Sequence, residues 1–167
     1  MKIVKAIVAV VVLLLAAQFI RRSLYPQYRC HVVVTQNVRN NTEALAGLTD
    51  SVLVAMRARD NLAELAPCLE RTPWNVRLQM LAGGNHSFRG QHEQAVQAYE
   101  TALSYERRPE THLALGKELL ELARTDEAMK HLVLACSVHP DWSSELLEPI
   151  RGEVNARVLA VRAGKAR

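Results

Sequence analysis

The sequence predicts an all-α protein, with an N-terminal transmembrane helix followed by a short helical-hairpin solenoid and a C-terminal capping helix. Three observations predict it. Residues 3–20 form a nearly continuous apolar run. Small residues recur about 33 positions apart through the middle of the chain. Apolar residues recur at helical spacing after Ser143. We therefore divide the 167 residues into an anchor (1–22), a connector (23–41), repeats (42–142), and a capping helix with a basic tail (143–167).

The apolar run reads IVKAIVAVVVLLLAAQFI, and Lys5 and Gln18 are its only strongly polar members. Such a helix rises about 27 Å, close to the ~30 Å hydrocarbon core of a bilayer. We prefer a single-span anchor to a signal peptide cleaved after Ala17, because Leu15 would occupy a position that prefers a small residue. A buried core helix is disfavoured because the segment has no polar face.

The charges on the two sides of the run are nearly balanced. The short basic N-terminus resembles a signal-anchor and favours an extracytoplasmic repeat domain, whereas Arg21 and Arg22 argue for the opposite orientation. We expect a single-pass membrane protein with the repeat domain slightly favoured outside the cytoplasm. Within the connector, we interpret His31 to Thr35 as a short strand or extended chain and Thr42 as the N-cap of the first repeat helix.

Charge is distributed unevenly along the chain. Residues 1–39 carry a net +6 and residues 151–167 a net +4, so the +4 of the whole chain leaves −6 on the middle. A nucleic-acid-binding domain should carry a basic face interleaved with stacking aromatics, and aromatics make up only 5% of this chain. We therefore expect no nucleic-acid partner.

The repeat rests on pairs of residues that stand 33 positions apart. The pairs are Gly83 and Gly116, Ala95 and Ala128, Tyr99 and Leu132, and Ala102 and Ala135. Small side chains let two helices approach closely, and a hairpin that cannot bury its apolar faces alone must stack on another. Pro140 follows the second of these hairpins and ends it.

These residues resemble the tetratricopeptide repeat family. The copy at 109–142 is the clearest, the copy at 76–108 has Arg107 where the proline should stand, and a degenerate copy at 42–75 is aligned by Leu65, Cys68 and Pro73. The resemblance implies a concave groove lined by the first helix of each hairpin. At 143–167, an apolar stripe interrupted by Pro149 is expected to cover the open end of the stack.

We expect the groove to present apolar side chains beside charged ones, as a peptide-binding surface does. The predicted partner-binding residues are Arg77, Met80, Ser87, Phe88, Glu110, Leu113, Lys117, Leu120 and Glu121. The alternative is that Met80 and Phe88 belong to the core. Gly84 stands where a carboxylate-clamp repeat would need Asn, so the resemblance does not imply binding of chaperone tails.

Nothing in the sequence indicates catalysis, a metal or a cofactor. The histidines lack a compact ligand pattern, and Glu118 and Glu121 read as an exposed acidic face. We interpret Cys68 and Cys136 as buried structural thiols. We expect no role for Cys30, although lipidation or a bridge between two copies are alternatives.

The sequence therefore predicts a membrane-anchored scaffold or assembly factor that binds a protein partner, itself membrane-associated. Its anchor at residues 3–20 would raise the effective concentration of that partner. The alternative is a structural accessory subunit of a larger membrane complex, filament or oligomer. An enzyme is the least favoured reading, because no polar cluster converges in the predicted groove.

Overall fold

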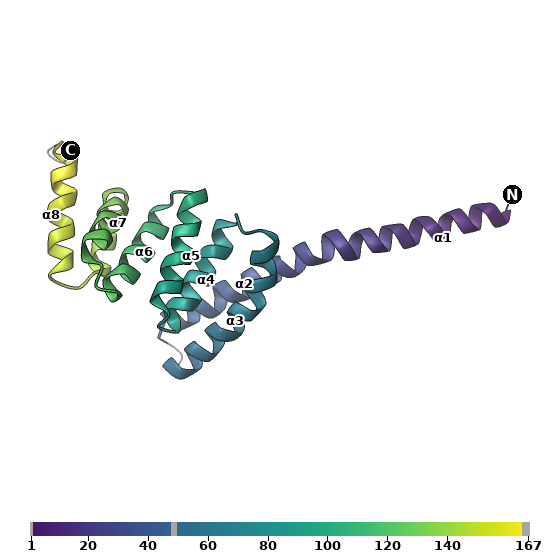
Figure 1. The fold of residues 1–167 in the computed structure, drawn as a ribbon, viewed down its shortest axis with the longest axis horizontal. Helices are drawn as coiled ribbons and strands as arrows, with labels where there is room; N and C mark the ends of the chain where they lie inside the picture. The colour runs from purple at the N-terminus through teal and green to yellow at the C-terminus, as the bar shows by residue number, and fades with distance from the viewer. Residues whose placement is uncertain (1, 48–49, 165–167) are drawn as a thin grey trace.

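The structure, a computed structural model, describes residues 2–47 and 50–164, with side chains from residue 10 onward except at 23, 27, 44 and 45. All regular structure in these ranges is helical (Figure 1). In chain order the elements are α1 (Lys2–Phe19), η1 (Ile20–Leu24), α2 (Tyr25–Leu45), α3 (Ser51–Arg71), α4 (Val76–Phe88), α5 (His92–Tyr105), α6 (Pro109–Glu121), α7 (Thr125–Val138), η2 (Pro140–Glu145) and α8 (Ile150–Arg162).

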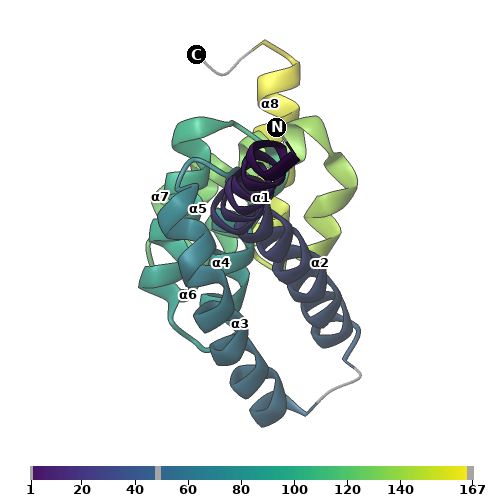
Figure 2. The ribbon, with the colours of Figure 1, turned by 90° about the vertical axis from the view of Figure 1, so that its right-hand side faces the viewer.

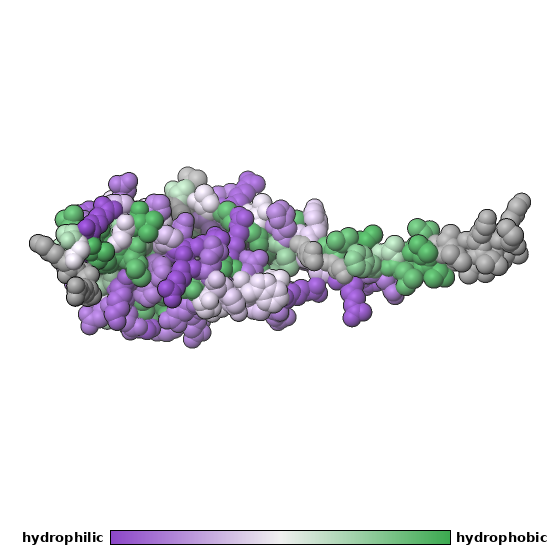
Figure 3. Space-filling view, turned by 90° about the horizontal axis from the view of Figure 1, so that it is seen from above, coloured by the Kyte–Doolittle hydropathy of each residue, from purple (hydrophilic) through white to green (hydrophobic). Residues whose placement is uncertain are grey.

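Helix α1 extends away from the body formed by the other helices, and η1 continues it into α2 without a break in helical backbone (Figure 1). Seen along α1, the body lies behind it as stacked helices (Figure 2). The described apolar side chains of α1 are exposed, for example Leu13 at 68%, and they form the hydrophobic part of the projecting rod in Figure 3.

The structure contradicts the predicted transmembrane anchor at 1–22. Among residues 2–47 and 50–164, no helix combines the length and the apolar character that crossing a bilayer requires. Residues 3–9 of the prediction lie outside the described side chains. The same finding contradicts the predicted single-pass membrane localisation.

The predicted connector at 23–41 is also different, because it is helical. The run His31 to Thr35 lies inside α2, where Thr35 Oγ1 donates a hydrogen bond to the carbonyl of His31 at 3.0 Å. Thr42 is not an N-cap, since its hydroxyl donates to the carbonyl of Val38 within the same helix. The cap of the next helix is Asp50, whose carboxylate accepts from the Val52 amide at 2.7 Å.

Helices α4 to α7 form two hairpins with equivalent internal contacts. A Cβ added at Gly83 would stand 2.5 Å from the Tyr99 ring, and one added at Gly116 would stand 2.6 Å from Leu132 Cδ2. The absence of a Cβ at these two glycines therefore sets how closely the helices of each hairpin approach. The turns match as well, because Gly90 (φ 67°) and Ala123 (φ 56°) both adopt the left-handed conformation.

The main apolar core runs through these hairpins and into the C-terminal cap. Leu115, Leu132 and Val154 are fully buried in it. The cap differs from the single interrupted helix that was expected, because residues 140–145 form η2 and α8 begins only after Pro149. Val154 and Val158 of α8 are buried, whereas Leu147 is 85% exposed. Lys165 and Arg167 of the predicted basic tail lie outside the described residues.

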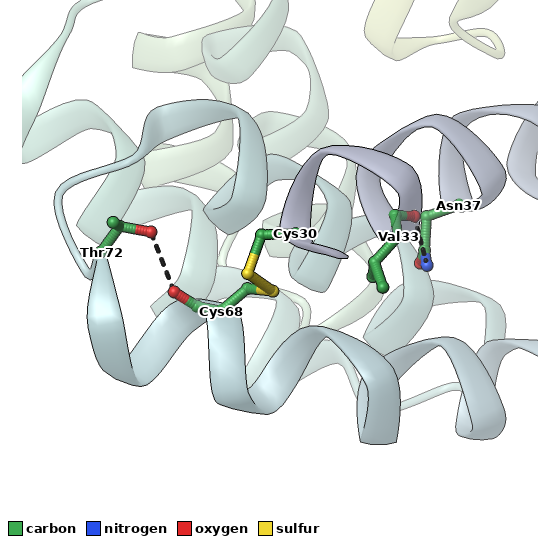
Figure 4. The surroundings of a disulfide bond; sticks show 5 residues. All are labelled: Cys30, Val33, Asn37, Cys68 and Thr72. Atoms are coloured by element: carbon green, nitrogen blue, oxygen red, sulfur yellow. Dashed lines mark hydrogen bonds between the residues drawn. A yellow bond between two sulfur atoms is a disulfide. The ribbon is translucent and has the colours of Figure 1, made fainter. Parts of the chain in front are cut away.

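A disulfide between Cys30 and Cys68 joins α2 to α3 (Figure 4). The prediction that Cys30 has no role and that Cys68 is a thiol is therefore wrong, because the helical path of residues 25–45 brings two cysteines 38 positions apart side by side. Cys136 is a free, buried cysteine.

Buried asparagines connect the same part of the molecule. Asn85 Nδ2 donates to Asn37 Oδ1 at 3.0 Å and accepts at Oδ1 from Asn61 Nδ2 at 2.9 Å. Asn61 accepts in turn from Asn40 Nδ2 at 2.9 Å. These amides tie α2, α3 and α4 into one packed unit, because each would be costly to bury without its partner.

Candidate partner-binding groove

A groove of about 420 Å³ lies along α4 and α6 and is also lined by residues of α2, α5 and η2. Its size falls in the range of natural ligand sites. We call it the α4–α6 groove. It is lined by Asn41, Gly84, Ser87, Phe88, Tyr99, Glu110, Leu113, Ala114, Lys117, Glu118, Trp142 and Glu145.

The floor of the groove is shaped by a glycine. A Cβ added at Gly84 would meet Asn41 Nδ2 at 3.5 Å and Tyr99 Oη at 3.7 Å, which are ordinary contacts. The hydroxyl end of Tyr99 therefore faces the space above Gly84. Burial, and secondly the negative charge of Glu118, raise the pKa of Tyr99 well above its usual value, so it remains a neutral hydroxyl that can donate or accept.

Glu118 is buried in the wall of the groove, with only 7% of its surface exposed. Ser87 Oγ donates to Oε1 at 2.6 Å, and His92 Nδ1 lies 2.9 Å from Oε2. An ionised carboxylate only accepts, so His92 donates from Nδ1. This network links α4, α5 and α6. The expectation that Glu118 belongs to an exposed acidic face is wrong, because α6 turns this residue toward the neighbouring hairpin.

The three side chains of this network do not form a nucleophilic triad. A histidine base must accept the proton of the serine, whereas here both Ser87 and His92 contact the carboxylate. The arrangement holds a negative charge in a fixed position, and we assign it no catalytic step.

Charged side chains and an aromatic side chain also line the groove. Lys117 Nζ contacts Glu145 Oε2 at 2.5 Å and so connects α6 to η2. Trp142 is partly buried against His139, with ring centroids 4.2 Å apart. Glu110 is exposed at the first turn of α6, where a negative charge suits the helix N-terminus.

Five of the nine predicted partner-binding residues line this groove, namely Ser87, Phe88, Glu110, Leu113 and Lys117. The other four lie elsewhere. Arg77 borders a separate hollow beside Cys30 and Thr72. Met80 is half-buried and accepts a contact from the Thr111 hydroxyl at 3.3 Å. Leu120 packs against the core, and Glu121 is exposed.

Sequence reasoning missed six lining residues, Asn41, Tyr99, Ala114, Glu118, Trp142 and Glu145. Asn41 fell in the expected connector, and Tyr99 was assigned to packing between hairpins, a role that its buried ring also has. Trp142 directly follows the proline-terminated hairpin, and a large aromatic at that point is a signal that could have been used.

A pair of histidines outside the groove has no sequence signal. His112 of α6 and His131 of α7 lie with their Nδ1 atoms 2.8 Å apart, so one ring donates to the other. Burial, and for His112 also the neighbouring His131, lower the pKa of both side chains. Within the described part of the chain, no group of three or more His, Cys, Asp or Glu side chains is arranged to hold a metal ion.

Comparison with models of known protein families gives no match to this chain, and comparison with curated proteins gives none either.

Proposed function

We propose that the chain is a protein–protein interaction module of the tetratricopeptide type, which acts as a scaffold or assembly factor by holding a segment of a partner protein in the α4–α6 groove. The observation that carries the proposal is the groove itself. It joins apolar side chains, Phe88, Leu113 and Trp142, to fixed polar groups at the junction of successive helices.

The surroundings of the groove suit binding better than chemistry. The α4–α5 and α6–α7 hairpins share a continuous apolar core, so their relative positions are set before any partner arrives. A pre-formed surface of this kind binds with a smaller ordering cost than a flexible one. The polar groups in the wall, Ser87, His92 and Glu118, already have partners, which leaves the groove well defined in the free protein.

Filling the groove tests the proposal. Gly84→Leu places a side chain over the floor while its Cβ meets only ordinary contacts, and leucine favours the helix that contains it. Selection from a random peptide library on the immobilised full chain should enrich peptides that bind the parent and fail to bind this variant. Gly152→Leu is the matched control, because it makes the same change on the exposed face of α8. The proposal is wrong if the parent and Gly84→Leu enrich the same peptides.

One observation favours a second function, that of a permanent structural subunit of a larger complex. Val10, Leu13 and Leu14 of α1 are more than half exposed on a helix that projects from the body (Figure 1). A constitutive subunit should stay with its complex through washes of rising salt, whereas an adaptor bound through the groove should be released.

A further inference from the structure

We infer that the α4–α6 groove selects a protein segment in which a basic side chain stands beside a bulky apolar one. This inference rests on the proposed function and adds the chemistry of the partner. It follows from the charges that line the groove, from the net charge of the segment that supplies the lining residues, and from the apolar surface next to those charges.

The groove contains more negative than positive charge. Three carboxylates line it, those of Glu110, Glu118 and Glu145, against the single ammonium group of Lys117. The contact between Lys117 and Glu145 neutralises one of the three. Glu110 has no ion pair among the described residues, and each oxygen of Glu118 has one contact, which leaves it free to accept another. A cation that enters the groove therefore meets unbalanced negative charge.

The segment that supplies every lining residue of the groove has the same sign. Residues 40–150 carry a net charge of −6, whereas the basic residues concentrate in the first 39 and the last 17 positions. A field of one sign over the binding face raises the local concentration of oppositely charged ligands and speeds their association. The segment and the groove lining thus favour a basic ligand over an acidic one.

The apolar requirement comes from the side chains between the charges. Phe88 and Leu113 lie in the groove together with the Tyr99 ring, and Trp142 stands beside Glu145 at its end. An apolar side chain of the partner that covers these residues also removes water from the carboxylates. The attraction between a bound cation and Glu118 or Glu110 then becomes stronger than it would be in open water.

Short synthetic peptides test the inference directly. Three peptides share the same Leu and Phe residues and carry Lys, Gln or Glu at the same two positions. Affinities are measured from the fluorescence of Trp142 in the full chain with Trp74→Phe, since the chain has only two tryptophans. We expect the Lys peptide to bind most tightly and the Glu peptide least tightly, with the advantage of Lys falling as salt is added.

Charge variants in the groove should change this order in a known direction. Glu110→Gln with Glu145→Gln should weaken the Lys peptide by about three- to tenfold, because it removes the unpaired carboxylate of Glu110 and leaves the ammonium group of Lys117 without its partner. Lys117→Gln should tighten it, because the repelling ammonium group is gone. Glu70→Gln with Glu100→Gln is the control, since both residues are exposed and neither lines this groove.

Each result has a distinct meaning. If the Gln or Glu peptide binds as tightly as the Lys peptide, or if the Glu70 and Glu100 control weakens binding as much as the groove variant, the inference is overturned while the proposed function stands. If the Lys peptide binds equally well to Gly84→Leu, its site is not the groove and both ideas fail together.

Discussion

The α2–α3 pair and the two hairpins that follow it are held together by different chemistry. In α4 to α7, apolar side chains pack where Gly83 and Gly116 lack a Cβ, and the same contacts recur at a fixed interval. In α2 and α3, a disulfide and a line of buried asparagine amides replace most of that apolar packing, and the apolar cluster around Leu65 and Leu78 is small. Covalent and polar links thus hold the α2–α3 pair where its apolar core is small.

The largest effect is expected from filling the close contacts of the repeat. Ala95 and Ala128 have no exposed surface, so Ala95→Leu with Ala128→Leu forces each hairpin apart. Overpacking costs about 1–3 kcal/mol per site, and we expect the double variant to lose its cooperative thermal transition in circular dichroism. Ala66→Leu with Ala156→Leu is the control at exposed helix positions. An unchanged melting curve for the first variant would contradict the close-packing account.

Removing the disulfide should destabilise the other region. Cys30→Ser with Cys68→Ser releases a link across 38 positions, and such links contribute about 2–4 kcal/mol. Hydrogen exchange should accelerate in α2 and α3 far more than in α6 and α7. A reductant should reproduce the effect in the parent and do nothing further to the variant. Uniform acceleration over all helices would show that the two regions are not separately stabilised.

The next largest loss of stability is expected from breaking the hydrogen-bond network of Asn37, Asn40, Asn61 and Asn85. Asn85→Ala removes the buried partner of Asn37 Oδ1 and of Asn61 Nδ2, which costs about 1–3 kcal/mol. Urea unfolding measures the loss, and Asn155→Ala on the exposed face of α8 serves as control. If Asn85→Ala unfolds at the same urea concentration as the parent, the network does not stabilise the α2–α4 unit.

The histidine pair should make the repeat hairpins sensitive to mild acid. The pKa values of His112 and His131 are lowered in the folded state, mainly by burial. At His112 the neighbouring His131 and Arg107 lower the pKa further, whereas at His131 Glu127 raises it and Lys130 lowers it. The unfolded chain therefore takes up protons first, at the ordinary value of 6.5. Stability from the neutral pair is complete above that pH and is lost as the pH falls toward the lowered values.

Thermal unfolding at about pH 7.5 and about pH 5.5 checks this expectation. His112→Asn with His131→Asn should reduce the difference in melting temperature between the two pH values, because the pair no longer takes up protons on unfolding. The carboxylates of the chain titrate in both proteins and account for the difference that remains. An equal difference in parent and variant would show that the pair does not contribute.

The smallest effect is expected from equalising the two turns. Ala123 adopts a φ of 56° at the position where the preceding hairpin has Gly90, and a left-handed conformation is unfavourable for a residue with a Cβ. Ala123→Gly should stabilise the chain by about 0.5 kcal/mol, since the relief of strain exceeds the added freedom of the unfolded chain. Gly90→Ala should have the opposite sign. A loss of stability in Ala123→Gly would show that this turn carries no strain.

The helical hairpins were predictable because their signal is local and periodic. Gly83, Gly116 and the alanines 33 positions apart indicated where helices lie closely together, and the structure shows close contacts at both glycines. The groove was predictable only in part. The tetratricopeptide resemblance placed Ser87, Glu110 and Lys117 on the lining face, but Trp142 and Glu145 reach the groove through η2, whose path the repeat does not describe.

The errors have a common cause. Cys30 was predicted to have no partner, Glu118 to be exposed, and residues 23–41 to form a connector. The true environment of each of these residues depends on a segment that is distant in sequence and packs beside it. The composition of the apolar run at 3–20 indicated a transmembrane helix. Among the described residues, however, no helix has the length and apolarity that a membrane span requires.

By itself, the sequence determined that the chain is helical, where the repeating hairpins lie, and that the body is acidic, since these follow from residue types and spacings along the chain. Only the tertiary structure decided that Cys30 meets Cys68, that Asn37, Asn61 and Asn85 share hydrogen bonds, and that Glu118 is held between Ser87 and His92. Such contacts join residues far apart in sequence, and their free energy depends on distances that exist only once the helices have packed.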